Sequence, residues 1–132
     1  MLNVVGAVLI DNNYILLPKR SYKLKKMPNK YEFPGGKVEE NETLKEALKR
    51  ELNEELSIEV NIIDIIEFPN NVLINENLIL IIFIIKKWKN KLTINPEINS
   101  EILQVKLDKL KNVEDLLETD KELIPSILKF LK

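Results

Sequence analysis

Three glutamates within five residues, Glu51, Glu54 and Glu55, are the part of the sequence that most directly indicates chemistry. They lie in the segment 43–56, whose composition and capping-box start predict a helix. At about 100° per residue, Glu51 and Glu55 share an arc with the leucines that should face a core, and Glu54 lies at its edge. The spacing therefore predicts carboxylates on a buried helix face.

Buried carboxylates need a positively charged partner. Without one, each costs several kcal/mol or becomes protonated, and acids at i,i+3 and i,i+4 spacing repel each other. A solvated charged face is the common alternative for a Glu-rich helix, but positions 51 and 55 fall on the apolar arc. A hard divalent ion binds carboxylate oxygens together with water and phosphate. We therefore expect a Mg²⁺ site, with Mn²⁺ as a possible substitute.

The composition excludes several other kinds of catalytic site. The chain has no Cys and no His, which excludes thiolate zinc sites, cysteine nucleophiles and a histidine base. Catalysis must then depend on carboxylates, Lys, Tyr, Ser or Thr, or on a metal ion bound by oxygen.

A glycine pair, Gly35 and Gly36, precedes the acidic helix. Adjacent glycines permit positive φ and allow the backbone to approach a metal or phosphate closely. A plain turn is the alternative interpretation. The short distance along the chain to the glutamates favours a functional one.

These elements together resemble the Nudix box, G-x5-E-x7-R-E-U-x-E-E-x-G-U, where U is a bulky aliphatic residue. The matching residues are Gly36, Glu42, Arg50, Glu51, Leu52, Glu54, Glu55 and Ile58. The final glycine of the box is Ser57 here, and a non-Gly residue at a left-handed helix end typically costs on the order of 1 kcal/mol. The segment 31–39 is also similar to the run that precedes the box in the MutT-like branch.

The resemblance implies an α/β (or α+β) fold with a mixed β-sheet sandwiched between helices. It implies metal ligands as well: the carboxylates of Glu51, Glu54 and Glu55 and the carbonyl of Gly36.

The resemblance also assigns supporting roles. Arg50 would hold the architecture through a nearby carboxylate such as Glu42. Glu101 matches a later acid that faces the metals, although a surface acid is an equal alternative. With no His, the general base would be Glu51, Glu54 or, through a water, Glu101.

The implied reaction converts a nucleoside triphosphate and water to a monophosphate and pyrophosphate. Arg20 and Lys37 are candidate phosphate contacts, or merely solvated cations. Asp120 either contacts the base or caps the last helix. Sanitation of 8-oxo-dGTP is the leading expectation, and (d)CTP pyrophosphohydrolysis is the alternative. An inactive nucleotide-sensing Nudix domain is the alternative of another class.

The remaining elements must position this site. Strands are expected at 4–10, 14–18, 78–88 and 101–107, with 78–88 buried on both faces. β-branched residues return at 58–68. A closing helix is expected at 120–131, with Pro125 in its first turn or at a kink.

The bulk properties suit one small domain, residues 1–132. The net charge of −1 argues against a broad basic face for polymeric nucleic acid, so the expected partner is a small nucleotide. The most apolar run, 78–85, is too short to cross a bilayer. We expect a cytoplasmic protein without a membrane partner, as a monomer or homodimer.

Overall fold

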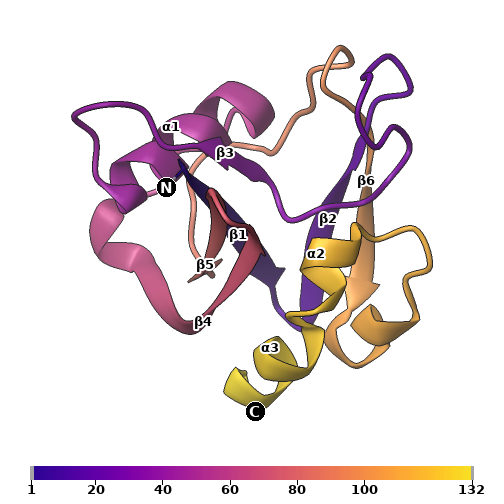
Figure 1. Cartoon of the computed structure of the whole chain (residues 1–132). Helices are drawn as coiled ribbons and strands as arrows, with labels where there is room; N and C mark the ends of the chain where they lie inside the picture. The colour runs from indigo at the N-terminus through magenta and orange to yellow at the C-terminus, as the bar shows by residue number, and fades with distance from the viewer. Residues whose placement is uncertain (1, 132) are drawn as a thin grey trace.

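The computed structural model describes residues 2–131, which form a six-stranded mixed sheet (Figure 1). The strand order is β4-β5-β1-β2-β6, and β3 pairs separately with β1. The β1–β5 pair is parallel and every other pair is antiparallel. The strands are β1 (Leu2–Asp11), β2 (Tyr14–Arg20), β3 (Gly35–Lys37), β4 (Ile65–Asn75), β5 (Leu78–Ile85) and β6 (Asn99–Lys106). The expected mixed sheet is confirmed.

Helices cover both faces of this sheet (Figure 1). On one face, α1 (Leu44–Leu56) packs its leucines against the odd-numbered residues of β1 and β5. On the other face, the even-numbered residues of these strands pack against the C-terminal helices. These are the 3₁₀ helix η2 (Leu107–Asn112), α2 (Glu118–Lys121) and α3 (Ile124–Phe130). The period-2 alternation of β1 and β5 thus fills two cores, and the predicted sandwich is confirmed.

Both ends of α1 are fixed by the residues that the sequence indicates. Thr43 Oγ1 accepts a bond from the Glu46 N–H at 3.1 Å, and Glu46 Oε1 accepts from the Thr43 N–H at 2.8 Å. At the other end, Ser57 has φ 59° and ψ 24°, the left-handed conformation for which glycine is usual. The helix that carries the glutamates therefore starts and stops where the box requires.

The sheet splits between β1 and β2, and this split creates the site. The two strands pair only where Leu9–Asp11 meet Tyr14–Leu16, and they diverge beyond that point (Figure 1). The segment 31–37 bridges the gap: the Glu32 N–H donates to the Pro18 carbonyl, and the Ala7 N–H donates to the Pro34 carbonyl. Side chains from β2, β3 and α1 can therefore meet at the open end.

Two segments differ from the expectation. Within 58–68, Ile58 and Val60 are buried against α1 without continuous strand pairing, a 3₁₀ helix η1 (Ile62–Asp64) follows, and β4 begins at Ile65. Apolar burial, not sheet pairing, accounts for the β-branched residues there. The closing helix is divided into α2 and α3, with Pro125 in the first turn of α3.

The apolar strand β5 ends at Ile85, three residues before the expected end at Trp88. It lies between β1 and β4 and contributes to both cores, as predicted for a strand buried on both faces. Within residues 2–131, every helix is too short or too polar to cross a membrane.

Candidate active site

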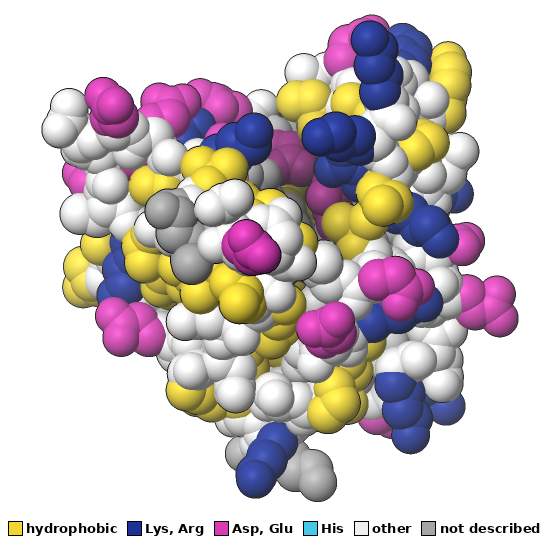
Figure 2. Space-filling model, viewed as in Figure 1, with side chains coloured by type: hydrophobic (Ala, Val, Ile, Leu, Met, Phe, Trp, Pro, Cys, Tyr) yellow, Lys and Arg dark blue, Asp and Glu magenta, His cyan; other side chains and the backbone are white. Residues whose placement is uncertain are grey.

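An acidic cleft of about 150 Å³ lies at the split between β1 and β2. Figure 2 shows a hollow in this face of the molecule, with acidic side chains inside it and basic side chains beside it. Four of the lining side chains are carboxylates and one is a guanidinium. The lining residues are Arg20, Glu32, Gly35, Glu51, Glu54, Glu55 and Ile98.

Glu55 is the most buried acid of the cleft, only 6% exposed. Burial raises the pKa of Glu55 to about 8, and the nearby charges of Glu32 and Glu51 raise it further, while a hydrogen bond from the Gly35 backbone opposes the shift. The charged form of this side chain therefore needs a cation that the protein alone does not supply.

Glu51 lies against the backbone of Gly36 in β3. A Cβ at position 36 would come within 2.6 Å of both Glu51 carboxylate oxygens, so any larger residue there would have to displace the Glu51 carboxylate. The glycine at position 36 thus leaves room for the Glu51 carboxylate, and the expected approach of the backbone to a metal or phosphate stays a prediction. The positive φ that adjacent glycines permit is not used here: none of the described glycines has one, and Gly35 and Gly36 are extended residues of a strand.

Arg50 organises the carboxylates around it. Its Nη2 and Nε donate to the two oxygens of Glu42 at 2.6 and 3.1 Å, which confirms the expected pair. Its Nη1 lies 2.8 Å from Glu51 Oε1 and 3.4 Å from Glu54 Oε2. The bond to Arg50 lowers the pKa of Glu42, and it opposes the rise that burial causes in the pKa of Glu51.

The oxygen donors of the cleft are chemically suited to a hard divalent ion. Every candidate ligand offers oxygen, and a cation would stabilise the charged form of buried Glu55. Among the described residues, no three acidic side chains lie close enough together to form a complete ligand set for a metal ion. A single guanidinium nitrogen of Arg50 contacts both Glu51 and Glu54. The residues that could hold the ion are Glu51, Glu54, Glu55 and the Gly36 carbonyl.

The other candidate residues lie at different distances from the cleft. Arg20 lines it, with Nη1 3.1 Å from Glu32 Oε1. Lys37 is exposed. Glu101 is not among the lining residues: its Oε2 accepts from the Tyr31 hydroxyl at 3.1 Å, and its Oε1 lies 3.8 Å from Lys19 Nζ.

Asp120 is buried and contacts the segment 31–34. Its Oδ2 accepts a bond from the Phe33 N–H at 3.0 Å. Burial raises the pKa of Asp120 to about 7, and the Phe33 bond opposes the shift. The helix-cap interpretation is wrong, because α2 and α3 begin after Leu117 and Leu123, and Asp120 lies within α2.

Sequence reasoning missed Glu32, which lines the cleft with a side chain that is 14% exposed. Burial raises the pKa of Glu32, and the Arg20 charge opposes this. Glu32 lies outside the helix, so no periodicity marked it.

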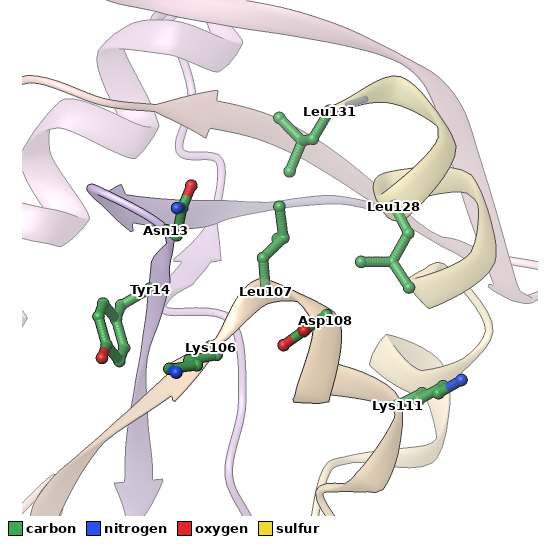
Figure 3. A pocket seen from close by; sticks show the side chains of 8 residues that line it. All are labelled: Asn13, Tyr14, Lys106, Leu107, Asp108, Lys111, Leu128 and Leu131. Atoms are coloured by element: carbon green, nitrogen blue, oxygen red, sulfur yellow. The ribbon is translucent and has the colours of Figure 1, made fainter.

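A larger pocket, about 680 Å³, lies between the start of β2 and α3. Figure 3 shows Leu107, Leu128 and Leu131 around it, with the Lys111 amine pointing away. Its only acid is Asp108, so it has no set of carboxylates that could hold a metal. The smaller acidic cleft is therefore the candidate active site.

Comparison with known proteins identifies the family of the chain. The NUDIX domain family model matches residues 2–128. The 8-oxo-dGTP diphosphatase of Proteus vulgaris is 36% identical over 93 residues, which cover 70% of this chain and 82% of that protein. The CTP pyrophosphohydrolase of Escherichia coli (strain K12) is 42% identical over 62 residues, 47% of this chain and 45% of that protein.

The fold has solved counterparts. The crystal structure of a MutT Nudix hydrolase from Burkholderia pseudomallei superimposes with a TM-score of 0.80 at 21% identity, covering 96% of this chain and 97% of that one. Nudix hydrolases generally use divalent metals, in line with the oxygen donors of the cleft. The chain therefore belongs to the Nudix family and is a MutT-like Nudix hydrolase.

Proposed function

We propose that this protein is a Mg²⁺-dependent nucleoside triphosphate pyrophosphohydrolase that removes 8-oxo-dGTP from the cytoplasmic nucleotide pool, as a monomer or homodimer. The observation that carries the proposal is the cleft itself, where four carboxylates face a single guanidinium. Such a site repels phosphate unless divalent cations are bound, and it becomes a phosphate site once they are. Mn²⁺ is expected to substitute.

The residues of the cleft have different proposed roles in the reaction. Glu51, Glu54, Glu55 and the Gly36 carbonyl would hold the ion, which neutralises phosphate oxygens and lowers the pKa of the attacking water when bound. Arg50, fixed by Glu42, orients Glu51 and Glu54. Of these acids, Glu54 has the most exposed side chain, 59%, and is our candidate for the base that removes the proton from water.

Two further acids and two cations complete the proposal. Glu101 could act through a water only after leaving Tyr31 and Lys19. Arg20 is already in the cleft, and two of its five N–H groups lack a described protein partner, so they are available to phosphate. Lys37 is exposed and would reach only the outer phosphates.

The base preference depends on Asp120. One carboxylate oxygen is used by the Phe33 N–H, and the other can accept from a base. An acceptor suits the N–H groups of a guanine-type edge and also the amino group of cytosine. The relatives act on both types, as an 8-oxo-dGTP diphosphatase and a CTP pyrophosphohydrolase. A (d)CTP substrate is therefore the second candidate.

A nucleotide panel tests the activity and the substrate together. Purified protein is incubated with 8-oxo-dGTP, dGTP, CTP or dCTP, with Mg²⁺, with Mn²⁺ and with a chelator, and pyrophosphate release is measured. We expect metal-dependent release that is fastest with 8-oxo-dGTP. Faster turnover of CTP or dCTP would favour the second candidate. No turnover of any nucleotide by folded, metal-supplied protein would support an inactive nucleotide-sensing domain.

Asp120→Asn tests the base contact. Asparagine keeps an oxygen for the Phe33 N–H but adds donor hydrogens, so the ratio of kcat/KM between 8-oxo-dGTP and CTP should change by about tenfold, the effect of one hydrogen bond. Asp120→Ala should raise KM more than it lowers kcat. If selectivity is unchanged in both variants, Asp120 serves only to hold Phe33.

A further inference from the structure

A basic loop, residues 21–30, borders the acidic cleft. It contains Lys23, Lys25, Lys26 and Lys30 and no acidic residue. Lys25 and Lys26 are exposed. The loop begins directly after Arg20, which lines the cleft, and the Arg20 guanidinium contacts two loop carbonyls, so the loop backbone lies beside the cleft.

The side chain of Arg20 holds this loop in place. Its Nη2 donates to the Lys26 carbonyl at 2.9 Å, and its Nε donates to the Met27 carbonyl at 3.1 Å. Met27 has φ 47°, a left-handed conformation that is unfavourable for a long side chain. The guanidinium thus stabilises a turn that the local sequence does not favour.

The backbone of Arg20 fixes the other end of the loop. Its N–H donates to the Lys30 carbonyl at 2.8 Å, and its carbonyl accepts from the Asn29 N–H at 2.9 Å. Both ends of the turn 26–30 therefore depend on one residue of β2.

Glu32 holds the Arg20 guanidinium at Nη1, the nitrogen that does not bond to the loop. Its Oε1 lies 3.1 Å from Arg20 Nη1, and both side chains are mostly buried, 14% and 24% exposed. The Glu32 backbone is itself fixed to β2 by the N–H bond to the Pro18 carbonyl. The pair therefore forms a rigid connection between the floor of the cleft and the loop.

We propose that Glu32 is a positioning residue that acts through Arg20 to hold the basic loop at the mouth of the acidic cleft. The phosphates of the substrate then meet cations that are already ordered, which favours binding because less conformational entropy is lost. This inference rests on the proposed function. It gives Glu32 a role different from that of a metal ligand, although Glu32 also lines the cleft.

A double-mutant cycle tests this role. Glu32→Ala, Arg20→Ala and the double variant are assayed for KM and kcat on the preferred nucleotide at saturating Mg²⁺. We expect each single change to raise KM about fivefold or more, with kcat changed less than about threefold, and the double variant to match Arg20→Ala within about twofold. Glu32→Gln, which keeps a neutral acceptor for Arg20, should restore part of the loss.

A second measurement does not need activity. Amide hydrogen exchange in residues 24–30 should become about tenfold faster in Glu32→Ala and in Arg20→Ala. Lys30→Gln is the matched control. It removes the ion pair between Lys30 Nζ and Asp115 Oδ1, which are 3.9 Å apart, and it leaves the side chain of Arg20 unchanged. Its exchange in this segment should stay within about twofold of the wild type.

Two results would overturn the inference. One is unchanged exchange of the loop in Glu32→Ala. The other is additive loss of kcat in the double variant, with a higher Mg²⁺ requirement, which would make Glu32 a metal ligand. If the wild-type protein hydrolyses no nucleotide, the proposed function fails, and the exchange experiment still decides the role of Glu32.

Discussion

The three glutamates at the C-terminal half of α1 differ in environment although they are neighbours in sequence. Glu55 is buried, Glu51 is partly covered by Gly36, and the side chain of Glu54 is 59% exposed. Helical geometry produces this gradient, since successive positions turn from the core face toward solvent. A buried carboxylate depends on a cation, whereas an exposed one can exchange protons with water. Their roles are therefore expected to differ.

Glu54→Gln tests the role of the exposed glutamate separately from the two that are more buried. The change removes charge but almost no volume, so activity should fall about 100-fold or more, as for loss of a general base or ligand. The melting temperature should change by less than about 3 °C, because an exposed ion pair such as the one with Arg50, at 3.4 Å, contributes about 0–1 kcal/mol.

Glu76→Gln, an exposed acid in the β4–β5 turn, provides the control for loss of one negative charge. It should leave both activity and melting temperature nearly unchanged. If Glu54→Gln kept a near-normal rate, the role assigned to Glu54 would be wrong.

At the scale of elements, α1 is the structure that the sequence predicts best, because its signals are local. The capping box joins residues three apart, and the apolar arc repeats within four residues. The mixed sheet and the pairing of Arg50 with Glu42 were anticipated too, through the resemblance to the Nudix box.

Features that depend on distant contacts were not predictable. The Phe33–Asp120 bond joins residues 87 positions apart, and no local signal distinguishes it from a helix cap. Beyond the split between β1 and β2, Val4–Gly6 of β1 pair with β3 instead, and Glu32 lies in the cleft next to this pairing. The break between α2 and α3, in contrast, has a local signal, because Pro125 lies in the first turn of α3.

The C-terminal end of α1 offers a test at this scale. Ser57 has φ 59°, so Ser57→Gly should relieve backbone strain and raise the free energy of unfolding by about 0.5–1 kcal/mol, net of the extra chain entropy of glycine. Thermal unfolding should show a melting temperature about 1–4 °C higher. Thr43→Ala, which removes the cap at the opposite end, should lower stability by about 1 kcal/mol. A lower melting temperature for Ser57→Gly would mean that the serine side chain itself stabilises the helix end.

For the whole molecule, the net charge of −1 conceals a strong local separation of charge. Four carboxylates gather in the acidic cleft, while cations of the loop 21–30 lie beside it (Figure 2). The balanced total allows the chain to keep an unfavourable acidic site without a broad field that would attract polymeric nucleic acid. The unfavourable burial of these carboxylates should therefore lower the free energy of unfolding of the whole protein.

This cost should depend on pH. The pKa of Glu55 is about 8 and that of Asp120 about 7 in the folded protein, against about 4 in an unfolded chain. Between these values the folded state retains protons that the unfolded state has released. The free energy of unfolding of the metal-free protein should therefore fall as pH rises from about 5 to about 8 and then level off.

Glu55→Gln should remove much of this dependence. Glutamine cannot ionise, so the metal-free variant should melt at least about 4 °C above the metal-free wild type at pH 8, where the wild-type carboxyl is partly charged, and close to it at pH 5. Mg²⁺ should raise the melting temperature of the wild type at pH 8 by stabilising the charged carboxylate, and should raise that of the variant much less. Thermal unfolding at both pH values, with chelator and with Mg²⁺, measures all four quantities. A metal-free wild type that grows more stable from pH 5 to pH 8 would contradict the assignment of a buried, cation-dependent carboxylate at position 55.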